Sequence, residues 1–344
     1  MSERPSASTG LAAFVAAFLV ACGPPRPVAA TPDDPAPAAP RGVSVPFRLI
    51  DNRIWVDAFI DDAGPFRFAF DTGGANALTP QVAARLGLAT QPAGRATGAG
   101  EAAVSYARTR VARFRIGALL LPDQQFMVLD TSPIQRAFGF AAFDGLFGFE
   151  VLARYAARIE FAVDPADPAI GRLTFTEDVQ PAEVAGFDRV PFTLVADKPV
   201  VAAVIDGVPA RVLLDTGDRT ALTILTAFLA HPAIGRVFAG RPEQLTGYGI
   251  GGPIPAKLGV VGHLQWCARC ELRDVVARQP TTKAGFNALT TIDASLGNEV
   301  LRQFTIVFDY RHGVAYVAPN ADFGTPTRFT PVPFPPTPDA PAPR

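Results

Sequence analysis

The chain has 344 residues, 49% of them hydrophobic, so it is long enough to bury one large core or two smaller ones. Its net charge of -1 gives no indication that it binds nucleic acid or an anionic membrane surface. With only three Cys and three His, a metal site rich in these residues is not expected.

The first 22 residues predict a targeting segment. Leu11–Ala21 is an uninterrupted run of apolar and small residues, too short to span a bilayer as a mature helix. It leads into Ala21-Cys22-Gly23, which resembles a bacterial lipoprotein signal in which Cys22 becomes the lipidated first residue. The alternative is an ordinary secretory signal with Cys22 incidental. Under either reading the protein is exported, and we expect it on the periplasmic side of a bacterial envelope, held to a membrane through a lipid if Cys22 is modified.

Residues 23–42, rich in Pro and Ala, predict an extended tether. The interior consists of short alternating or apolar segments bounded by Gly, Pro, Asn and Asp, which predicts a mainly β fold. A short helix is expected at Pro80–Leu86, with Thr79 as its cap, and a second at Asn298–Gln303. Residues 326–344 are again Pro-rich and predict a spacer or disordered tail. The expected strands are Val43–Leu49, Ile54–Ile60, Phe66–Phe70, Thr109–Ile116, Val200–Ile205, Arg211–Leu214 and Phe304–Asp309.

An internal repeat is the most informative feature of the sequence. Two Asp-Thr-Gly motifs, at Asp71 and Asp215, lie 144 positions apart, and Ala-Leu-Thr triplets follow them at the same offset. Downstream, Gly148 and Gly297 head matching segments 149 positions apart. The repeat predicts two copies of one unit, at residues 43–180 and 181–325.

The chemistry points to the two aspartates. Each follows an apolar strand, where an ionisable side chain is costly unless it is used or paired. The alternative is that the motif is only a turn that closes a strand. Duplication alone does not exclude this alternative, because a structural turn would be copied as well. Two carboxyls at hydrogen-bonding distance share one proton, so one can act as base toward a water while the other polarises a carbonyl. This chemistry needs neither a metal nor a cofactor. No Gly-x-Ser-x-Gly or His-Glu-x-x-His motif is present.

From Val43 to Pro319 the sequence resembles the retropepsin-like aspartic peptidases, and specifically bacterial exported members with two units in one chain. The resemblance is carried by Phe70-Asp71-Thr72-Gly73-Gly74, Leu214-Asp215-Thr216-Gly217-Asp218, Phe147-Gly148 and Leu296-Gly297. It implies two homologous β-barrel lobes with a cleft between them and an aspartic endopeptidase acting on peptide or protein substrates, active as a monomer. Asp71 and Asp215 would form the catalytic dyad. Thr72, Gly73, Thr216 and Gly217 would support it, with the apolar-Gly segments packed behind the catalytic loops.

Two positions depart from the family pattern, which usually has Ala or Ser after Asp-Thr-Gly. Here the residues are Gly74 and Asp218. If Asp218 points inward, it should raise the pKa values of the dyad. If it points outward, toward Arg219 or another cation, it is a structural substitution. These departures motivate an alternative function: a catalytically weak or inactive peptide-binding or scaffold lipoprotein on the same fold.

Two Gly-rich segments, Thr97–Gly100 and Gly247–Gly252, lie where the family places flaps over the cleft. Gly98, Gly100, Tyr248 and Gly249 are therefore candidates for closing over substrate, with Tyr248 as the aromatic contact. The alternative is that both segments are ordinary loops. An extended peptide would bind by strand-like main-chain hydrogen bonds.

Cys267 and Cys270 are the cysteines left when Cys22 is set aside. In an exported protein they predict a disulfide across a hairpin tip, ahead of a redox motif, which lacks its βαβ context, or a zinc site, which lacks further ligands. His231, His263 and His312 are scattered and indicate surface or packing residues.

Overall fold

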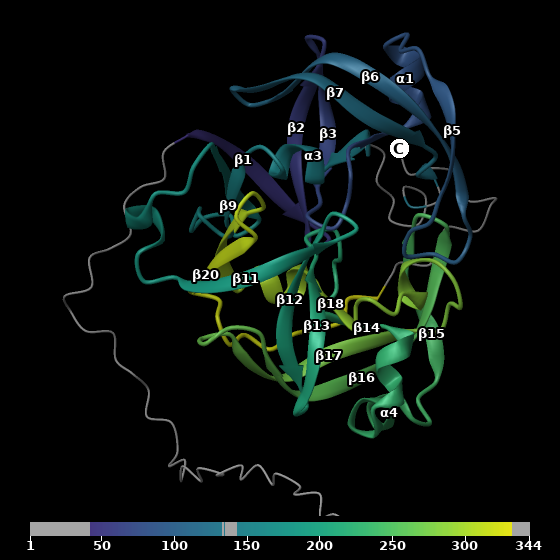
Figure 1. Ribbon diagram of the computed structural model, residues 1–344, viewed down its shortest axis with the longest axis vertical. Helices are drawn as coiled ribbons and strands as arrows, with labels where there is room; N and C mark the ends of the chain where they lie inside the picture. Colours follow the sequence, from purple (N-terminus) through teal and green to yellow (C-terminus); the bar gives the residue numbers. More distant parts are fainter. Residues whose placement is uncertain (1–41, 133, 135–142, 332–344) are drawn as a thin grey trace, which may run out of the picture. The chain divides into compact units, whose positions relative to one another are not determined.

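The computed structural model describes residues 42–132, 134 and 143–331, all within one compact unit, Ala36–Arg344 (Figure 1). Cys22, the signal segment, nearly all of the tether and the end of the tail lie outside the described residues. No helix in the described part of the chain has the length and apolar character needed to cross a membrane.

Strands dominate the described chain, as the sequence predicts, and helices are short. The helical elements are α1 Pro80–Arg85, α3 Phe149–Leu152, η1 Pro181–Val184, η2 Thr226–Ala230, α4 Pro232–Phe238, η3 Phe286–Ala288 and α5 Asn298–Leu301. The strands are β1 Val43–Ile50, β2 Arg53–Ile60, β3 Ala63–Phe70, β4 Ala77–Leu78, β5 Gln91–Ala96, β6 Val104–Ile116, β7 Leu119–Leu129, β8 Gly145–Phe147, β9 Ala156–Glu160, β10 Ile170–Thr176, β11 Asp188–Val195, β12 Lys198–Ile205, β13 Val208–Leu214, β14 Leu222–Ile224, β15 Glu243–Gly249, β16 Gly252–Gln265, β17 Glu271–Pro280, β18 Ala294–Leu296, β19 Phe304–Asp309 and β20 Val314–Pro319.

Local sequence explains many of these boundaries. The two-residue turn between β2 and β3 holds Asp61 and Asp62 at positive φ, and the turn between β12 and β13 does the same with Asp206 and Gly207. Helix α1 begins after Thr79, whose side chain accepts a hydrogen bond from the Val82 N–H. Both expected helices are therefore present, each within a residue or two of its expected end.

The first half of the described chain (residues 42–180) and the second half (residues 181–331) contain the same strand pairings. In the first half β3 pairs antiparallel with β2 and parallel with β8, and β4 pairs parallel with β7. In the second half β13 pairs antiparallel with β12 and parallel with β18, and β14 pairs parallel with β17. Each half thus presents its Asp-Thr-Gly motif at the end of an inner strand flanked by two others.

A run of six antiparallel strands joins the two halves, in the order β1, β10, β9, β19, β20, β11. Its central pair, β9 with β19, aligns Ala157 with Phe308 and Ile159 with Ile306. Strand β1 also pairs with β2, and β11 with β12, so this run continues into the strands of each half.

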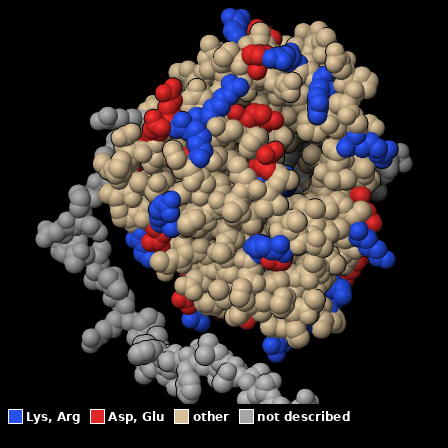
Figure 2. Space-filling view, in the orientation of Figure 1, with Lys and Arg blue, Asp and Glu red and all other residues tan. Residues whose placement is uncertain are grey.

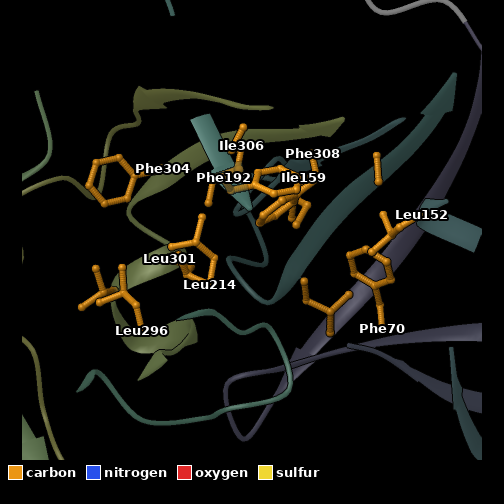
Figure 3. Packing of buried hydrophobic residues seen from close by; sticks show 14 of the residues in the cluster. Phe70, Leu152, Ile159, Phe192, Leu214, Leu296, Leu301, Phe304, Ile306 and Phe308 are labelled. Carbon is orange, nitrogen blue, oxygen red and sulfur yellow. The ribbon is translucent and has the colours of Figure 1, made fainter. Parts of the chain in front are cut away.

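The main core draws buried side chains from both halves (Figure 3). Phe70 and Leu214, which directly precede the two motif aspartates, are fully buried, as are Ile306 and Phe308 of the joining strands. Burying an apolar side chain of this size contributes about 1.5–3 kcal/mol. The same packing that stabilises the core therefore anchors the ends of β3 and β13, where the motifs begin.

The first residues of the Pro-rich tail are hydrogen-bonded to the folded chain. Thr327 accepts from the Val276 N–H, the Arg328 N–H donates to Glu299, and the Thr330 carbonyl accepts from Arg219. Residues 326–330, expected to belong to a spacer or disordered tail, are therefore part of the folded chain.

Candidate active site

The two Asp-Thr-Gly motifs lie side by side, although 144 positions separate them in sequence. Each motif aspartate is tied by its N–H to the strand parallel to its own. Asp71 donates to the Phe147 carbonyl at 3.0 Å, and Asp215 donates to the Leu296 carbonyl at 2.9 Å. The strand ends thereby carry both carboxyls into the same cavity.

The threonines of the two motifs interlock through four hydrogen bonds. The Thr72 Oγ1 accepts from the Thr216 N–H at 3.0 Å and donates to the Leu214 carbonyl at 2.8 Å. The Thr216 Oγ1 accepts from the Thr72 N–H at 3.0 Å and donates to the Phe70 carbonyl at 3.0 Å. Both threonines have no exposed surface. This reciprocal arrangement fixes the position of each loop relative to the other.

The motif glycines allow the carboxyls to approach the opposite loop. A Cβ added to Gly73 would lie 2.9 Å from the Asp215 Cγ, and one added to Gly217 would lie 2.6 Å from the Asp71 Cγ. Each glycine N–H also donates to the carboxyl of its own motif, at 2.8 Å for Asp71 and 2.9 Å for Asp215. Only a residue without a side chain fits these two positions.

Burial favours the protonated form of both carboxyls. Burial raises the pKa of Asp215 well above its usual range, and the charges of Asp71 and Asp218 raise it further. Burial also raises the pKa of Asp71, although the Gly73 N–H, Lys198 and a hydrogen bond with Asp215 act in the opposite direction. We therefore expect Asp215 to hold the shared proton and Asp71 to be the ionised partner.

The apolar-Gly segments pack directly behind the two Asp-Thr-Gly loops. A Cβ on Gly148 would lie 2.1 Å from the Asp71 carbonyl oxygen, and one on Gly297 would lie 2.5 Å from the Asp218 carbonyl oxygen. The next residues donate to the loops, Phe149 to the Gly74 carbonyl and Asn298 to the Asp218 carbonyl. Backbone contact this close leaves no room for any residue other than glycine.

Asp218 lines the same cavity, yet its carboxylate is fully engaged by neighbouring groups. It forms an ion pair with Arg278 at 3.2 Å and accepts hydrogen bonds from Thr220 and Thr223. Burial alone would raise its pKa, but Arg278 and these hydrogen bonds outweigh burial and lower it. The cation beside Asp218 is therefore Arg278, whereas Arg219 pairs with Asp51.

The cavity in front of the dyad has a volume of about 360 Å³ and receives side chains from both halves. Figure 2 shows a hollow in this face of the molecule, with acidic and basic side chains near its rim. Besides the dyad, its walls include Trp55 and Leu146 from the first half and Lys198 and Arg278 from the second. A cavity of this size suits one or a few amino-acid side chains.

Two hairpin tips bound the cavity: the first tip, residues 97–103 between β5 and β6, and the second tip, residues 250–251 between β15 and β16. The tips are hydrogen-bonded to each other, Gly100 N–H to the Ile250 carbonyl at 2.9 Å and Ala102 N–H to the Gly251 carbonyl at 3.0 Å. Of the candidate flap residues, Gly98, Tyr248 and Gly249 line the cavity, while Gly100 packs against Gly251.

A loop of the second half holds the first tip and was not anticipated from the sequence. The Phe286 N–H donates to the Gly98 carbonyl at 2.8 Å, and the buried Asn287 side chain donates to the Ala99 carbonyl at 2.7 Å. Gly285 has a φ of 72° and lies against the Gly98 and Gly100 carbonyl oxygens. The motif Gly285-Phe286-Asn287 carries no recognisable sequence signal, since its role depends on a partner almost 190 positions away.

Three further residues near the dyad were also missed. The Tyr310 hydroxyl donates to the Thr72 carbonyl at 2.8 Å, and burial together with the two dyad charges raises its pKa well above its usual range. The Ser295 Oγ lies 3.5 Å from an Asp215 carboxyl oxygen. Lys198 lines the cavity at the start of β12. Only Ser295 had an available signal, because it lies in the repeated segment that contains Gly297.

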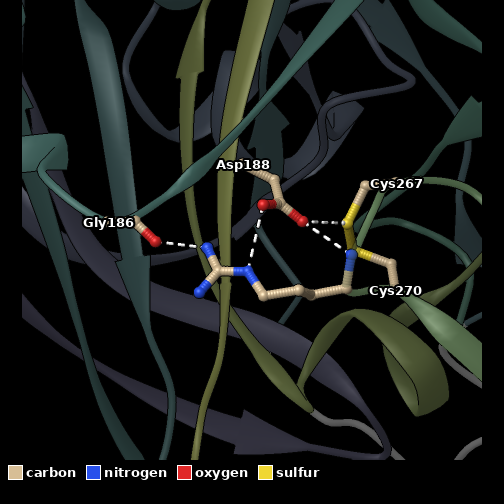
Figure 4. The surroundings of a disulfide bond; sticks show 5 residues. Gly186, Asp188, Cys267 and Cys270 are labelled. Carbon is tan, nitrogen blue, oxygen red and sulfur yellow. Dashed lines mark hydrogen bonds and ion pairs between the residues drawn. A yellow bond between two sulfur atoms is a disulfide. The ribbon is translucent and has the colours of Figure 1, made fainter. Parts of the chain in front are cut away.

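The Cys267–Cys270 pair forms a disulfide at the turn between β16 and β17 (Figure 4). One Asp188 carboxyl oxygen accepts from the Arg269 N–H at 2.7 Å, the other pairs with the Arg269 side chain at 3.0 Å, and Asp188 lies 3.1 Å from the Cys267 sulfur. The side chains of Asp188, Cys267 and Cys270 are close enough together to hold a metal ion. However, both sulfurs are bonded to each other and the carboxylate is already paired with Arg269.

The three histidines lie away from the dyad. His231 packs against Phe228, while His263 and His312 lie beside Glu271 and Asp309. None of them lines the cavity. Their partners are those of surface and packing residues, as the sequence indicates.

Comparison with known proteins agrees with this geometry for the first half of the chain. No curated protein sequence matches the chain. A family model does match, and the matched range contains the first motif, the first tip and the segment around Gly148. Residues 56–151 match the family model of the aspartyl proteases.

Proposed function

We propose that this protein is an aspartic endopeptidase in which Asp71 and Asp215 together activate a water molecule for attack on a peptide bond. The observation that carries the proposal is the reciprocal threonine interlock, which brings two carboxyls from distant parts of the chain into one cavity. The aspartyl protease match over residues 56–151 supports the same reaction class.

The chemistry follows from the unequal environments of the two carboxyls. Asp71, as the ionised member, accepts a proton from the water that attacks the carbonyl carbon. Asp215, as the protonated member, donates a hydrogen bond to the carbonyl oxygen, where negative charge develops. The Gly73 and Gly217 N–H groups orient the carboxyls, and the hairpin tips exclude bulk water.

The dyad also sets the expected pH dependence. Activity requires one shared proton, so it should be lost at low pH when both carboxyls are protonated and at high pH when neither is. Because burial raises the pKa of Asp215, the loss at high pH should occur above the range of an exposed aspartate. The activity of the wild type toward a peptide library between pH 3 and 8 measures both limbs.

The decisive experiment compares Asp71→Asn and Asp215→Asn with the wild type in an unbiased peptide-library digest. Each variant should lose at least about a thousandfold in kcat/KM while remaining folded, since the amide can neither take up nor share the proton. Asp274→Asn, at an exposed position of β17, is the matched control and should cleave like the wild type. Proteolysis that persists in either purified dyad variant would rule out the proposed function.

We further propose that the chain is a duplicated unit folded as two β-barrel lobes with the cleft between them. The shared pairings of β2–β3–β8 and β12–β13–β18 support this assignment, as does the repeat in the sequence. Because one chain supplies both aspartates, the proposed active form is a monomer. Sedimentation of the active protein at the mass of one chain would support it.

For location, we propose export and lipid anchoring through Cys22 on the periplasmic side of a bacterial envelope. The support is the apolar run that ends in Ala21-Cys22-Gly23. Labelling with a clickable fatty acid during expression should mark the wild type and not Cys22→Ser. Equal labelling of both proteins would refute the anchor without affecting the proposed chemistry.

A further inference from the structure

The two halves place different residues beside the dyad at equivalent positions. The Leu of each Ala-Leu-Thr triplet pairs with Ala277 in the second half and with Val128 in the first half. The next residues along these strands, Arg278 and Leu129, therefore occupy equivalent positions. Both line the cavity, and both are more than nine-tenths buried.

The same comparison holds in the loops after the motifs, where Asp218 occupies the position of Gly74. The second half thus carries an ion pair, Asp218 with Arg278 at 3.2 Å, where the first half carries a glycine and a leucine. A buried ion pair is costly to desolvate and is weak evidence for added stability. Its presence on one side of the cavity alone calls for a functional reason.

The Arg278 guanidinium is rigidly held by its neighbours. Its Nε donates to the Thr223 Oγ1 at 2.8 Å, and its Nη2 donates to an Asp218 carboxyl oxygen at 3.2 Å. Thr223 in turn donates to the other carboxyl oxygen of Asp218 at 2.7 Å, and Thr220 donates twice to the first. Asp218 and Thr223 therefore fix the orientation of the guanidinium plane.

One end of Arg278 remains available. Its Nη1 makes no hydrogen bond to any residue in the described ranges, and it lies next to Gly247, where an added Cβ would be 3.3 Å from it. Gly247 lines the cavity near the second tip. An acceptor that enters the cavity could therefore receive a hydrogen bond from Nη1.

The electrostatic surroundings favour an anionic acceptor. Lys198 also lines this wall, and among the described residues no carboxylate lies within ion-pair distance of it. Around Leu129, the lining of the first half is apolar and includes Met127 and Leu146, although Arg53 of the same half also lines the cavity. The two walls on either side of the dyad, around Arg278 and around Leu129, therefore differ in charge, and we expect them to contact different kinds of substrate side chain.

We propose that the cavity selects peptides with an acidic side chain on the Arg278 side of the scissile bond and a bulky apolar side chain on the Leu129 side. This inference rests on the proposed endopeptidase function and names its substrate class. Arg278 is a specificity residue that binds the substrate carboxylate through Nη1. Asp218 is a positioning residue that holds Arg278 and does not join the dyad.

The test makes the second half resemble the first. In the double variant Asp218→Gly/Arg278→Leu, the two positions receive the residues found at the equivalent positions of the first half, Gly74 and Leu129. Both members of the ion pair are removed together, so neither charge is left buried without its partner. The substrates are three peptides identical except for Glu, Gln or Leu at the position beside the scissile bond that faces Arg278. A library digest of the wild type identifies that position.

For the wild type we expect kcat/KM for the Glu peptide to exceed that for the Leu peptide by about tenfold or more, as for a charge-assisted hydrogen bond. The double variant should reverse this order. Arg278→Lys should retain part of the preference, and Arg273→Leu, the matched control at an exposed arginine of the same strand, should leave it unchanged. An unchanged Glu-over-Leu ratio in the double variant overturns the inference.

A binding measurement separates this inference from the proposed function. Fluorescence anisotropy with Asp215→Asn, which should not cleave, should show tighter binding of the Glu peptide than of the Leu peptide. If the wild type cleaves nothing but this difference persists, the endopeptidase proposal fails and the recognition proposal stands. Equal affinities overturn the recognition proposal. Should the double variant not fold, Asp218→Asn/Arg278→Gln replaces it, and it should lose the discrimination between Glu and Gln.

Discussion

Replacing Thr72 with valine isolates the contribution of the interlock, because the two side chains have nearly the same shape. The change removes the Oγ1 that accepts from the Thr216 N–H and donates to the Leu214 carbonyl. Both of those backbone groups stay buried without a partner. An unsatisfied buried group costs about 1–3 kcal/mol, so we expect Thr72→Val to lower the free energy of unfolding by about 2–6 kcal/mol.

Equilibrium urea unfolding followed by tryptophan fluorescence measures this loss. Thr72→Ser is the matched control, since it keeps both hydrogen bonds and loses only a methyl group, at a cost of about 1 kcal/mol. In the double variant Thr72→Val/Thr216→Val the two losses should not add, because the residues share one network. If Thr72→Val is as stable as Thr72→Ser, the interlock does not stabilise the protein and the reasoning is wrong.

Three further outcomes are expected. Because burial raises the pKa of Asp215, the folded state binds its proton more tightly than the unfolded state, and stability falls as pH rises from the unfolded pKa, near ~4, through the folded pKa. Asp215→Asn, which removes the titrating group, should therefore lose less stability than the wild type between pH 3 and pH 7; an equal or larger loss in the variant would contradict the raised pKa. Asn287→Ala removes the side-chain bond to the first tip, so hydrogen exchange at that tip should accelerate by about fivefold or more, whereas Lys283→Ala, an exposed change in the same loop, should have no effect; equal exchange in the two variants would show that the side chain does not hold the tip. The disulfide closes a loop with a sequence separation of 3, so Cys267→Ser/Cys270→Ser should cost no more than about 2 kcal/mol in chemical unfolding and leave peptide cleavage intact; a larger loss would mean that the bridge does more than close its own turn.

Much of the local structure could be predicted because it depends on neighbouring residues. Alternation with a period of two indicates the strands, and Thr79 and Pro80 mark the start of α1. The glycine after each motif threonine indicates a tight turn beneath a carboxyl. The repeat added what no single motif offers, because it placed two such turns in equivalent parts of one chain.

The residues that complete the site could not be predicted, because their partners are distant in sequence. Tyr310 reaches the Thr72 carbonyl across 238 positions, and Asn287 reaches the Ala99 carbonyl across 188. No periodicity or turn preference carries such information. The pairing of β9 with β19 could not be predicted either, because the sequence of each strand indicates that it is buried but not which strand lies beside it.

Asp218 illustrates the boundary between the two kinds of information. From sequence it is a third carboxylate near the dyad, with an inward and an outward reading both open. Folding brings Arg278, 60 positions away, to within 3.2 Å of it. Asp218 is therefore paired with a cation, and both residues line the cavity.

The sequence by itself thus determined the β-rich fold, the two motifs and their equivalent positions in the repeat. Strand periodicity and turn chemistry depend on neighbouring residues, and an internal repeat is found by comparing the sequence with itself. Only the tertiary structure decided how the motifs interlock, which burial and charges act on each aspartate, and which residues line the two walls of the cavity. Those properties arise from burial and from charges that folding brings together, and neither is encoded by any short stretch of residues.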